Sequence, residues 1–178
     1  MTLFRDGQEA EDDWVRVAED EPLPQSGKVV IGKARLIAER EGLRGRNAPL
    51  GLVLASGENL DGIEDEIEKL SLVVLDIPRY GDGRLYSIAR LLRDRHGYAG
   101  EIRAAGDVLR DQIMALHRVG VDSFEVTHAG TIEALRKGTI VAAVNHTQVA
   151  ARESEETKPG VRPWRRVSPP RSVPGVGH

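Results

Sequence analysis

Residues 82–112, DGRLYSIARLLRDRHGYAGEIRAAGDVLRDQ, decide the fold of this chain, and they read as helix, strand and helix. The first helical part carries apolar residues at the i, i+3, i+4, i+7 spacing that is typical of a face packed on a core: Leu85, Ile88, Ala89 and Leu92. Arg90 points away from that face, and Arg93 and Arg95 lie on its flanks. We therefore interpret these three arginines as surface residues.

Short β-rich runs alternate with helical patterns on both sides of this stretch. The expected strands cover 28–31, 50–54, 72–77, 100–104 and 123–126, and the expected helices cover 33–41, 60–69, 85–96, 107–119 and 131–137. Such alternation favours βα units and a mostly parallel sheet. The nearly continuous apolar run LSLVVLDI fits a central strand that is covered on both faces. We expect an α/β domain over 27–150 with about five strands in a flavodoxin-like three-layer sandwich; a partial βα barrel is the alternative.

The two ends of the chain differ from the middle. Residues 1–26 are acidic and are expected to form an N-terminal extension, in which Asp6-Gly7 turns a hairpin between Leu3-Phe4-Arg5 and Trp14-Val15-Arg16-Val17. Residues 151–178 are expected to form a disordered tail rich in proline and arginine. Of these, 157–178 hold five of the nine prolines, five basic residues and no acid, a composition that buries too little apolar surface to fold.

Composition excludes several classes of function. Hydrophobic residues make up 40% and charged residues 30%, as in ordinary globular proteins. The net charge of −3 gives no drive toward nucleic acid or an anionic membrane. The chain has no cysteine, which excludes disulfides, thiolate nucleophiles and Cys-ligated metals. No apolar signal core and no run of about 20 apolar residues is present, so we expect a cytoplasmic protein.

The carboxyl ends of the expected strands bring together one set of candidate site residues. Ligands of open parallel sheets bind outside the carboxyl ends of the strands, where loops meet helix N-termini. Applied here, that rule yields nine candidates: Asp82, Gly83, Arg84, Tyr86, Ser87, Arg103, Gly106, Asp107 and Arg110. Forked guanidinium donors beside helix amides suit a small oxyanion such as sulfite, phosphate or a carboxylate. Two structural alternatives remain open, because Arg84 can pair with Asp107, and Asp107 can be a helix N-cap.

Other chemistries find less support. No GxGxxG follows a strand and no GxxxxGK[ST] is present, so no cofactor is evident. The five histidines lack metal-ligand spacing, and only His128 follows an expected strand. The segment LVVLDIPRYGDG resembles the phosphoacceptor strand of response-regulator receivers, with Asp76 at its end. However, KVVIGK lacks the acidic pair that would hold magnesium, and Thr127-His128 stands in place of the receiver lysine.

One resemblance reaches beyond single motifs. Residues 77–126, IPRYGDGRLYSIARLLRDRHGYAGEIRAAGDVLRDQIMALHRVGVDSFEV, resemble an uncharacterised bacterial family associated with sulfite reduction, whose pattern is FPKFTDGRxYSxARLLRERYGYxGELRAxGDVLRDQ. The likeness extends more loosely to RDGQEAEDDWVRVAEDEPLP and NAPLGLVLASGE. Ile77-Pro78-Arg79-Tyr80 replaces the usual Phe-Pro-Lys-Phe, and the segment TIVAAVNHTQVAA diverges.

The resemblance implies a role in assimilatory sulfite reduction and a partner from the sulfite reductase system, without a mechanism. Our first hypothesis is therefore an accessory protein that binds a small oxyanion or a reductase partner through strand-end arginines. The family label also implies an alternative, an oxidoreductase with a soluble nucleotide cofactor. A third interpretation is an interaction scaffold whose arginines only pair with acids. We expect no nucleic acid, no membrane and no metal as partners, and no complete catalytic set is visible.

Overall fold

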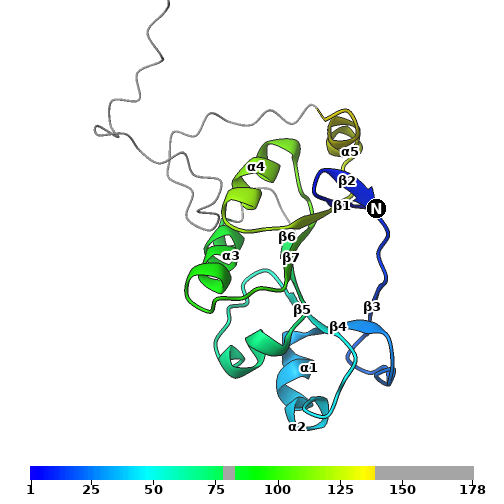
Figure 1. Cartoon of the computed structure of the whole chain (residues 1–178), viewed down its shortest axis with the longest axis vertical. Coiled ribbons are helices and arrows are strands. Elements are labelled where there is room, and N and C mark those ends of the chain that lie inside the picture. The colour runs from blue at the N-terminus through cyan, green and yellow to red at the C-terminus, as the bar shows by residue number, and fades with distance from the viewer. Residues whose placement is uncertain (78–82, 139–178) are drawn as a thin grey trace, which may run out of the picture.

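The computed structural model describes residues 1–77 and 83–138, and within them one sheet of eight strands (Figure 1). The strands are β1 (Thr2–Arg5), β2 (Gln8–Ala10), β3 (Trp14–Arg16), β4 (Lys28–Gly32), β5 (Leu50–Leu54), β6 (Leu72–Ile77), β7 (Glu101–Gly106) and β8 (Ser123–Val126). The helices are α1 (Lys33–Ala38), α2 (Arg40–Leu43), the 3₁₀ helix η1 (Glu64–Lys69), α3 (Arg84–Asp94), α4 (Arg110–Arg118) and α5 (Ala129–Arg136). None of the helices in the described part of the chain has the length and apolar content needed to cross a bilayer.

The strand order decides between the two expected architectures. The sheet runs β2-β1-β8-β7-β6-β5-β4-β3, and every pair from β3 to β8 is parallel. A flavodoxin-like sandwich needs a reversal of strand order, which places helices on both faces. Here the parallel strands β3 to β8 lie in chain order, so right-handed crossovers place the helices on one face. The flavodoxin-like prediction is wrong, the partial barrel is confirmed, and the sheet has eight strands, more than the five expected.

The additional strands come from residues 1–26. Asp6 and Gly7 have φ of 52° and 75°, which suits a two-residue hairpin turn between β1 and β2. The predicted hairpin exists, but its second arm is Gln8–Ala10, because the tight turn sets Arg5 opposite Gln8. The segment around Trp14 instead forms β3, which pairs with β4 at the far edge of the sheet.

A short connection forces the sheet to curl. The strands β2 and β3 lie at opposite edges of the sheet, yet only residues 11–13 separate them. That connection reaches at most about 14 Å, whereas the edges of a flat eight-stranded sheet lie about 34 Å apart. The sheet therefore bends into an open barrel, and the N-terminal segment spans its open side (Figure 1). The residues that face inward meet across the interior.

The predicted core face of α3 is confirmed. Its four stripe residues, Leu85, Ile88, Ala89 and Leu92, are buried against the outer face of the sheet. Arg90 and Arg95 are exposed, as expected. Arg93 is not a surface residue, because its guanidinium donates to the backbone oxygens of Gly100 and Gly120 and to the carboxylate of Asp122. Arg93 therefore ties α3 to the loops that precede β7 and β8.

Candidate functional site

The carboxyl ends of the parallel strands β4–β8 meet at one edge of the sheet, where α1, α3, α4 and α5 begin. Arg84 is the first residue of α3 and follows Gly83, and both are exposed. Its Nη2 lies 3.4 Å from Ser56 Oγ, in the loop after β5. Its Nη1 lies 3.7 Å from the point where a Cβ on Gly57 would stand. The guanidinium of Arg84 is therefore held over the exit of the neighbouring strand.

Gly106 ends β7 in a conformation that only glycine adopts without strain. Its φ is +100°, and an added Cβ would lie 2.4 Å from the backbone oxygen of Ile77. The same oxygen accepts a hydrogen bond of 2.8 Å from the backbone N–H of Asp107. Thr127 Oγ1, in the loop after β8, donates to the Gly106 oxygen at 3.3 Å. The glycine therefore lets the β6–β7 pairing continue to the edge of the site.

Asp107 is not the N-cap that its position predicts. The helix α4 begins three residues later, with Leu109 as its N-cap, and the Leu109 N–H donates to Gln112 Oε1 at 3.0 Å. The bond between Asp107 and Ile77 keeps the chain extended past β7, which delays the start of the helix. Arg110 is consequently the first residue of α4 and is exposed.

The two remaining candidates on α3 take different roles. Ser87 is exposed on the first turn of the helix. Tyr86 is half-buried and packs against the hydrophobic core. Asp82 lies outside the described residues. The structure therefore gathers Gly83, Arg84 and Ser87 at the start of α3, and Gly106, Asp107 and Arg110 between β7 and α4.

Arg103 does not belong to this site, contrary to the prediction. Side chains alternate along a strand, and because Ile102 and Ala104 face the helices, Arg103 faces the barrel interior. Its side chain is 2% exposed, and its Nη1 lies 2.8 Å from a carboxylate oxygen of Asp12. Its Nη2 lies 3.1 Å from Glu101 Oε1. The third interpretation, arginines that pair with acids, therefore describes Arg103.

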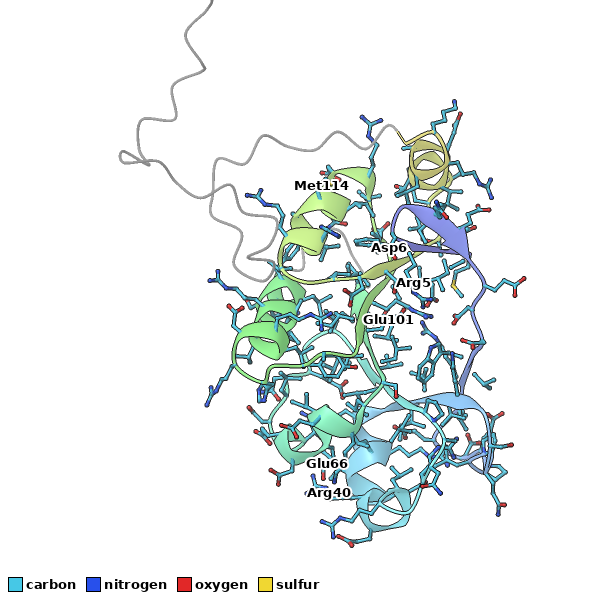
Figure 2. All side chains as sticks on the ribbon, viewed as in Figure 1. Arg5, Asp6, Arg40, Glu66, Glu101 and Met114 are labelled. Atoms are coloured by element: carbon cyan, nitrogen blue, oxygen red, sulfur yellow. The ribbon has the colours of Figure 1, made fainter. Side chains whose placement is uncertain are left out.

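Glu101 is the centre of this interior network. Arg5 donates to it at 2.7 Å and Ser123 Oγ at 2.6 Å (Arg5 and Glu101 in Figure 2). Burial alone would raise the pKa of the Glu101 carboxyl. The hydrogen bonds from Ser123 and Arg5 and the charge of Arg103 outweigh burial, so its pKa lies below the ordinary value. The carboxylate is thus held in its charged form.

Sequence reasoning missed Lys33 at this edge. Lys33 directly follows β4, and its Nζ donates to the backbone oxygen of Asn59 at 2.9 Å and to Asn59 Oδ1 at 3.1 Å. The strand-end rule would have found Lys33, because it stands two residues after the expected strand 28–31. With Arg84 and Arg110 it places three cations at the carboxyl edge.

These cations make the edge suited to anionic oxygens, since guanidinium and ammonium groups supply several N–H donors. His128 is also at this edge, but its Nδ1 accepts from the Thr131 N–H at 3.2 Å, which makes it the N-cap of α5. Within 1–77 and 83–138, no three His, Asp or Glu side chains cluster in a way that could hold a metal ion. The chemistry that this edge supports is anion binding.

Comparison with known proteins gives the family. No curated protein matches the chain. Residues 51–156 match the model of a family described as bacterial proteins of unknown function, DUF934. The match includes β6–β8, β5 except its first residue, and the helices α3, α4 and α5. Since it spans more than half of the sequence, the chain belongs to the bacterial protein family DUF934.

Proposed function

We propose that this protein is an accessory protein of assimilatory sulfite reduction that binds a small oxyanion at the carboxyl edge of β5–β7. The link to sulfite rests on the resemblance of residues 77–126 to a family associated with that process. The binding chemistry rests on the local geometry described above. Sulfite and sulfate present several anionic oxygens to the N–H donors of the site.

One observation carries the proposal. Arg84 and Arg110 are the first residues of α3 and α4, and these helices follow the neighbouring strands β6 and β7. An anion at this edge would meet two guanidinium groups and the positive ends of two helices. Arg110 has no ion-pair partner in the described part of the chain, and Arg84 is exposed beside Ser56.

Thermal unfolding with sulfite or sulfate tests the binding step. For a dissociation constant of about 1 mM, 10 mM ligand adds about 1.4 kcal/mol to the free energy of unfolding, which raises Tm by about 3–6 °C for a chain of this size. Arg84→Ala and Arg110→Ala should each abolish most of this rise. Arg90→Ala is the matched control, because Arg90 is exposed on the same helix and pairs with Asp94.

Equal Tm values with sulfite and with chloride at the same ionic strength would refute oxyanion binding. Recovery of sulfite reductase subunits in a pull-down, lost in Arg84→Ala, would then favour a protein partner at the same edge. The link to sulfur metabolism has its own test. Deletion of the gene should impair growth on sulfate or sulfite but not on cysteine, and equal growth on all three sources would contradict the assignment.

A further inference from the structure

A cavity of about 360 Å³ lies at the other end of the barrel, where β5 and β6 begin. The helices α1 and α2 form one wall, η1 forms the other, and the loop from α2 to β5 passes beside them. Figure 2 shows Arg40 and Glu66 facing one another between α2 and η1. The cavity shares no lining residue with the carboxyl edge.

The inner wall of the cavity is apolar. Leu36 and Leu70 are almost fully buried there, at 2% and 4% exposure. Leu43 and Leu50 are partly buried and pack against the same core. Ligand pockets commonly have volumes of about 300–1,000 Å³ and mostly apolar linings with a few polar groups. This cavity has the size and the apolar wall of a small-molecule site.

The polar groups of the cavity are incompletely satisfied. Three buried side-chain atoms in the described part of the chain have no hydrogen-bond partner: Arg40 Nε, Arg46 Nε and Glu66 Oε2. All three belong to residues that line this cavity. Arg40 Nε lies 2.9 Å from Glu66 Oε1, close enough for an ion pair but not aligned for a hydrogen bond. Buried polar atoms nearly always have partners, so these three atoms are unsatisfied positions in the wall of the cavity.

The charges around the cavity do not balance. Arg40 pairs with Glu66, and Arg44 pairs with Glu41 at 2.8 Å. The other two cations that line the cavity, Arg46 and Lys69, have no carboxylate partner within 1–77 and 83–138. Arg46 donates only to the backbone oxygens of Pro24 and Gly27, which leaves its charge uncompensated. Lys69 is exposed.

We propose that this cavity is a second binding site, for a small organic anion with an apolar body and an N–H or O–H donor. The body would lie on Leu36 and Leu70, the anionic group would meet Arg46 and Lys69, and the donor would reach Glu66 Oε2. Inorganic oxyanions lack the apolar part, so this ligand class differs from that of the carboxyl edge. The site extends the protein's chemistry beyond the proposed function.

The fluorescent anion 8-anilinonaphthalene-1-sulfonate is a suitable probe, because it joins an aromatic body, an N–H and a sulfonate. N-phenyl-1-naphthylamine is its matched control, since it has the same body and N–H without the charge. We expect saturable binding of the anion to one site per chain, and weaker binding of the neutral compound by about tenfold, because charge-assisted hydrogen bonds are the stronger class.

Two variants localise the probe. Lys69→Ala removes an exposed cation, so the fold should persist while affinity for the anion falls several-fold. Ala48→Trp places an indole in the cavity from the loop between α2 and β5 and should abolish binding. Lys137→Ala, an exposed lysine at the end of α5, is the control and should leave affinity unchanged.

Equal affinity for the charged and neutral compounds would overturn the proposal, as would binding that Lys69→Ala leaves unchanged. If Ala48→Trp does not fold, the comparison of Lys69→Ala with Lys137→Ala still decides. Arg84→Ala must retain the binding, because Arg84 lies at the carboxyl edge. Loss in Arg84→Ala instead of Lys69→Ala would assign the probe to the proposed oxyanion site and refute the second site.

Discussion

Arg103→Ala should be one of the most destabilising single changes in the barrel interior. The side chain is 2% exposed and faces Glu101, Asp12 and Glu125, with Glu125 itself 4% exposed. Removal of one member of a buried ion pair leaves an uncompensated charge in a medium of low polarity, which costs about 3–5 kcal/mol. The change also removes the apolar stem of the arginine from a packed interior.

The remaining partners set the expected value within that range. Glu101 keeps Arg5 at 2.7 Å, and Glu125 keeps Arg16 at 2.9 Å, but these two arginine side chains are 42% and 49% exposed. Solvent screens such pairs, so they compensate the stranded carboxylates only in part. We therefore expect a loss near the lower end, about 3 kcal/mol.

Urea unfolding followed by circular dichroism measures this loss as a shift of the midpoint at constant m-value. Arg90→Ala is the comparison, because its exposed pair with Asp94 should contribute only about 0.3–0.5 kcal/mol. The double variant Arg103→Met with Glu101→Gln should recover part of the loss, since it removes a carboxylate together with its cation. A loss for Arg103→Ala below about 1 kcal/mol would refute the buried network.

Three further changes test other parts of the structure. Gly106→Ala should lower the free energy of unfolding, measured in urea, by about 2–3 kcal/mol, because φ is +100° and the Cβ would lie 2.4 Å from the Ile77 oxygen. Gly62→Ala has open space around it and should cost less. Equal losses for the two variants would contradict this. Because the pKa of Glu101 is lowered in the folded protein, its carboxylate stabilises the fold fully above the ordinary value of 4.5, and this contribution is lost as pH falls through the lower folded pKa. Glu101→Gln should therefore flatten the plot of unfolding free energy against pH below about pH 4.5. An unchanged slope would argue against the shift. His128→Ala should lower the free energy of unfolding by about 1 kcal/mol, because it removes the N-cap of α5. It should leave the rise of Tm with sulfite unchanged. Loss of that rise would show that His128 contacts the ligand.

Local patterns were enough to predict five of the six parallel strands, β4 to β8. The runs at 28–31, 50–54, 72–77, 100–104 and 123–126 all became strands, because apolar β-rich runs between helical patterns are a short-range signal. Strand order is not such a signal, since it depends on where each crossover lands. The flavodoxin-like sandwich and the open barrel therefore share the same local pattern, and only the sheet distinguishes them.

The pairing of the N-terminal strands with the rest of the sheet was missed for a related reason. The strand β1 pairs with β8 through contacts such as Leu3 with Glu125, more than a hundred residues apart in the chain. Arg16 reaches Glu125 across the interior, which no periodicity reveals. Arg103 was misplaced by a different error, because the strand-end rule was applied to a residue in the middle of β7, where alternation of faces decides instead.

The N-terminal segment completes the barrel rather than extending it. Asp12 reaches Arg103, Asp13 reaches Lys28 at 2.6 Å, and Phe4 is 1% exposed in the main core. Residues 27–138 alone would expose the free edges of β4 and β8, and the interior network would lose Asp12, Arg5 and Arg16. The family match begins later, at residue 51. We therefore expect a chain that lacks residues 1–26 to lose its cooperative urea transition, measured by circular dichroism against the full chain. A truncated protein with an unchanged midpoint would show that the interior charges do not depend on the N-terminal strands. In that case the curl would come from the βα units alone, and not from the three-residue connection between β2 and β3.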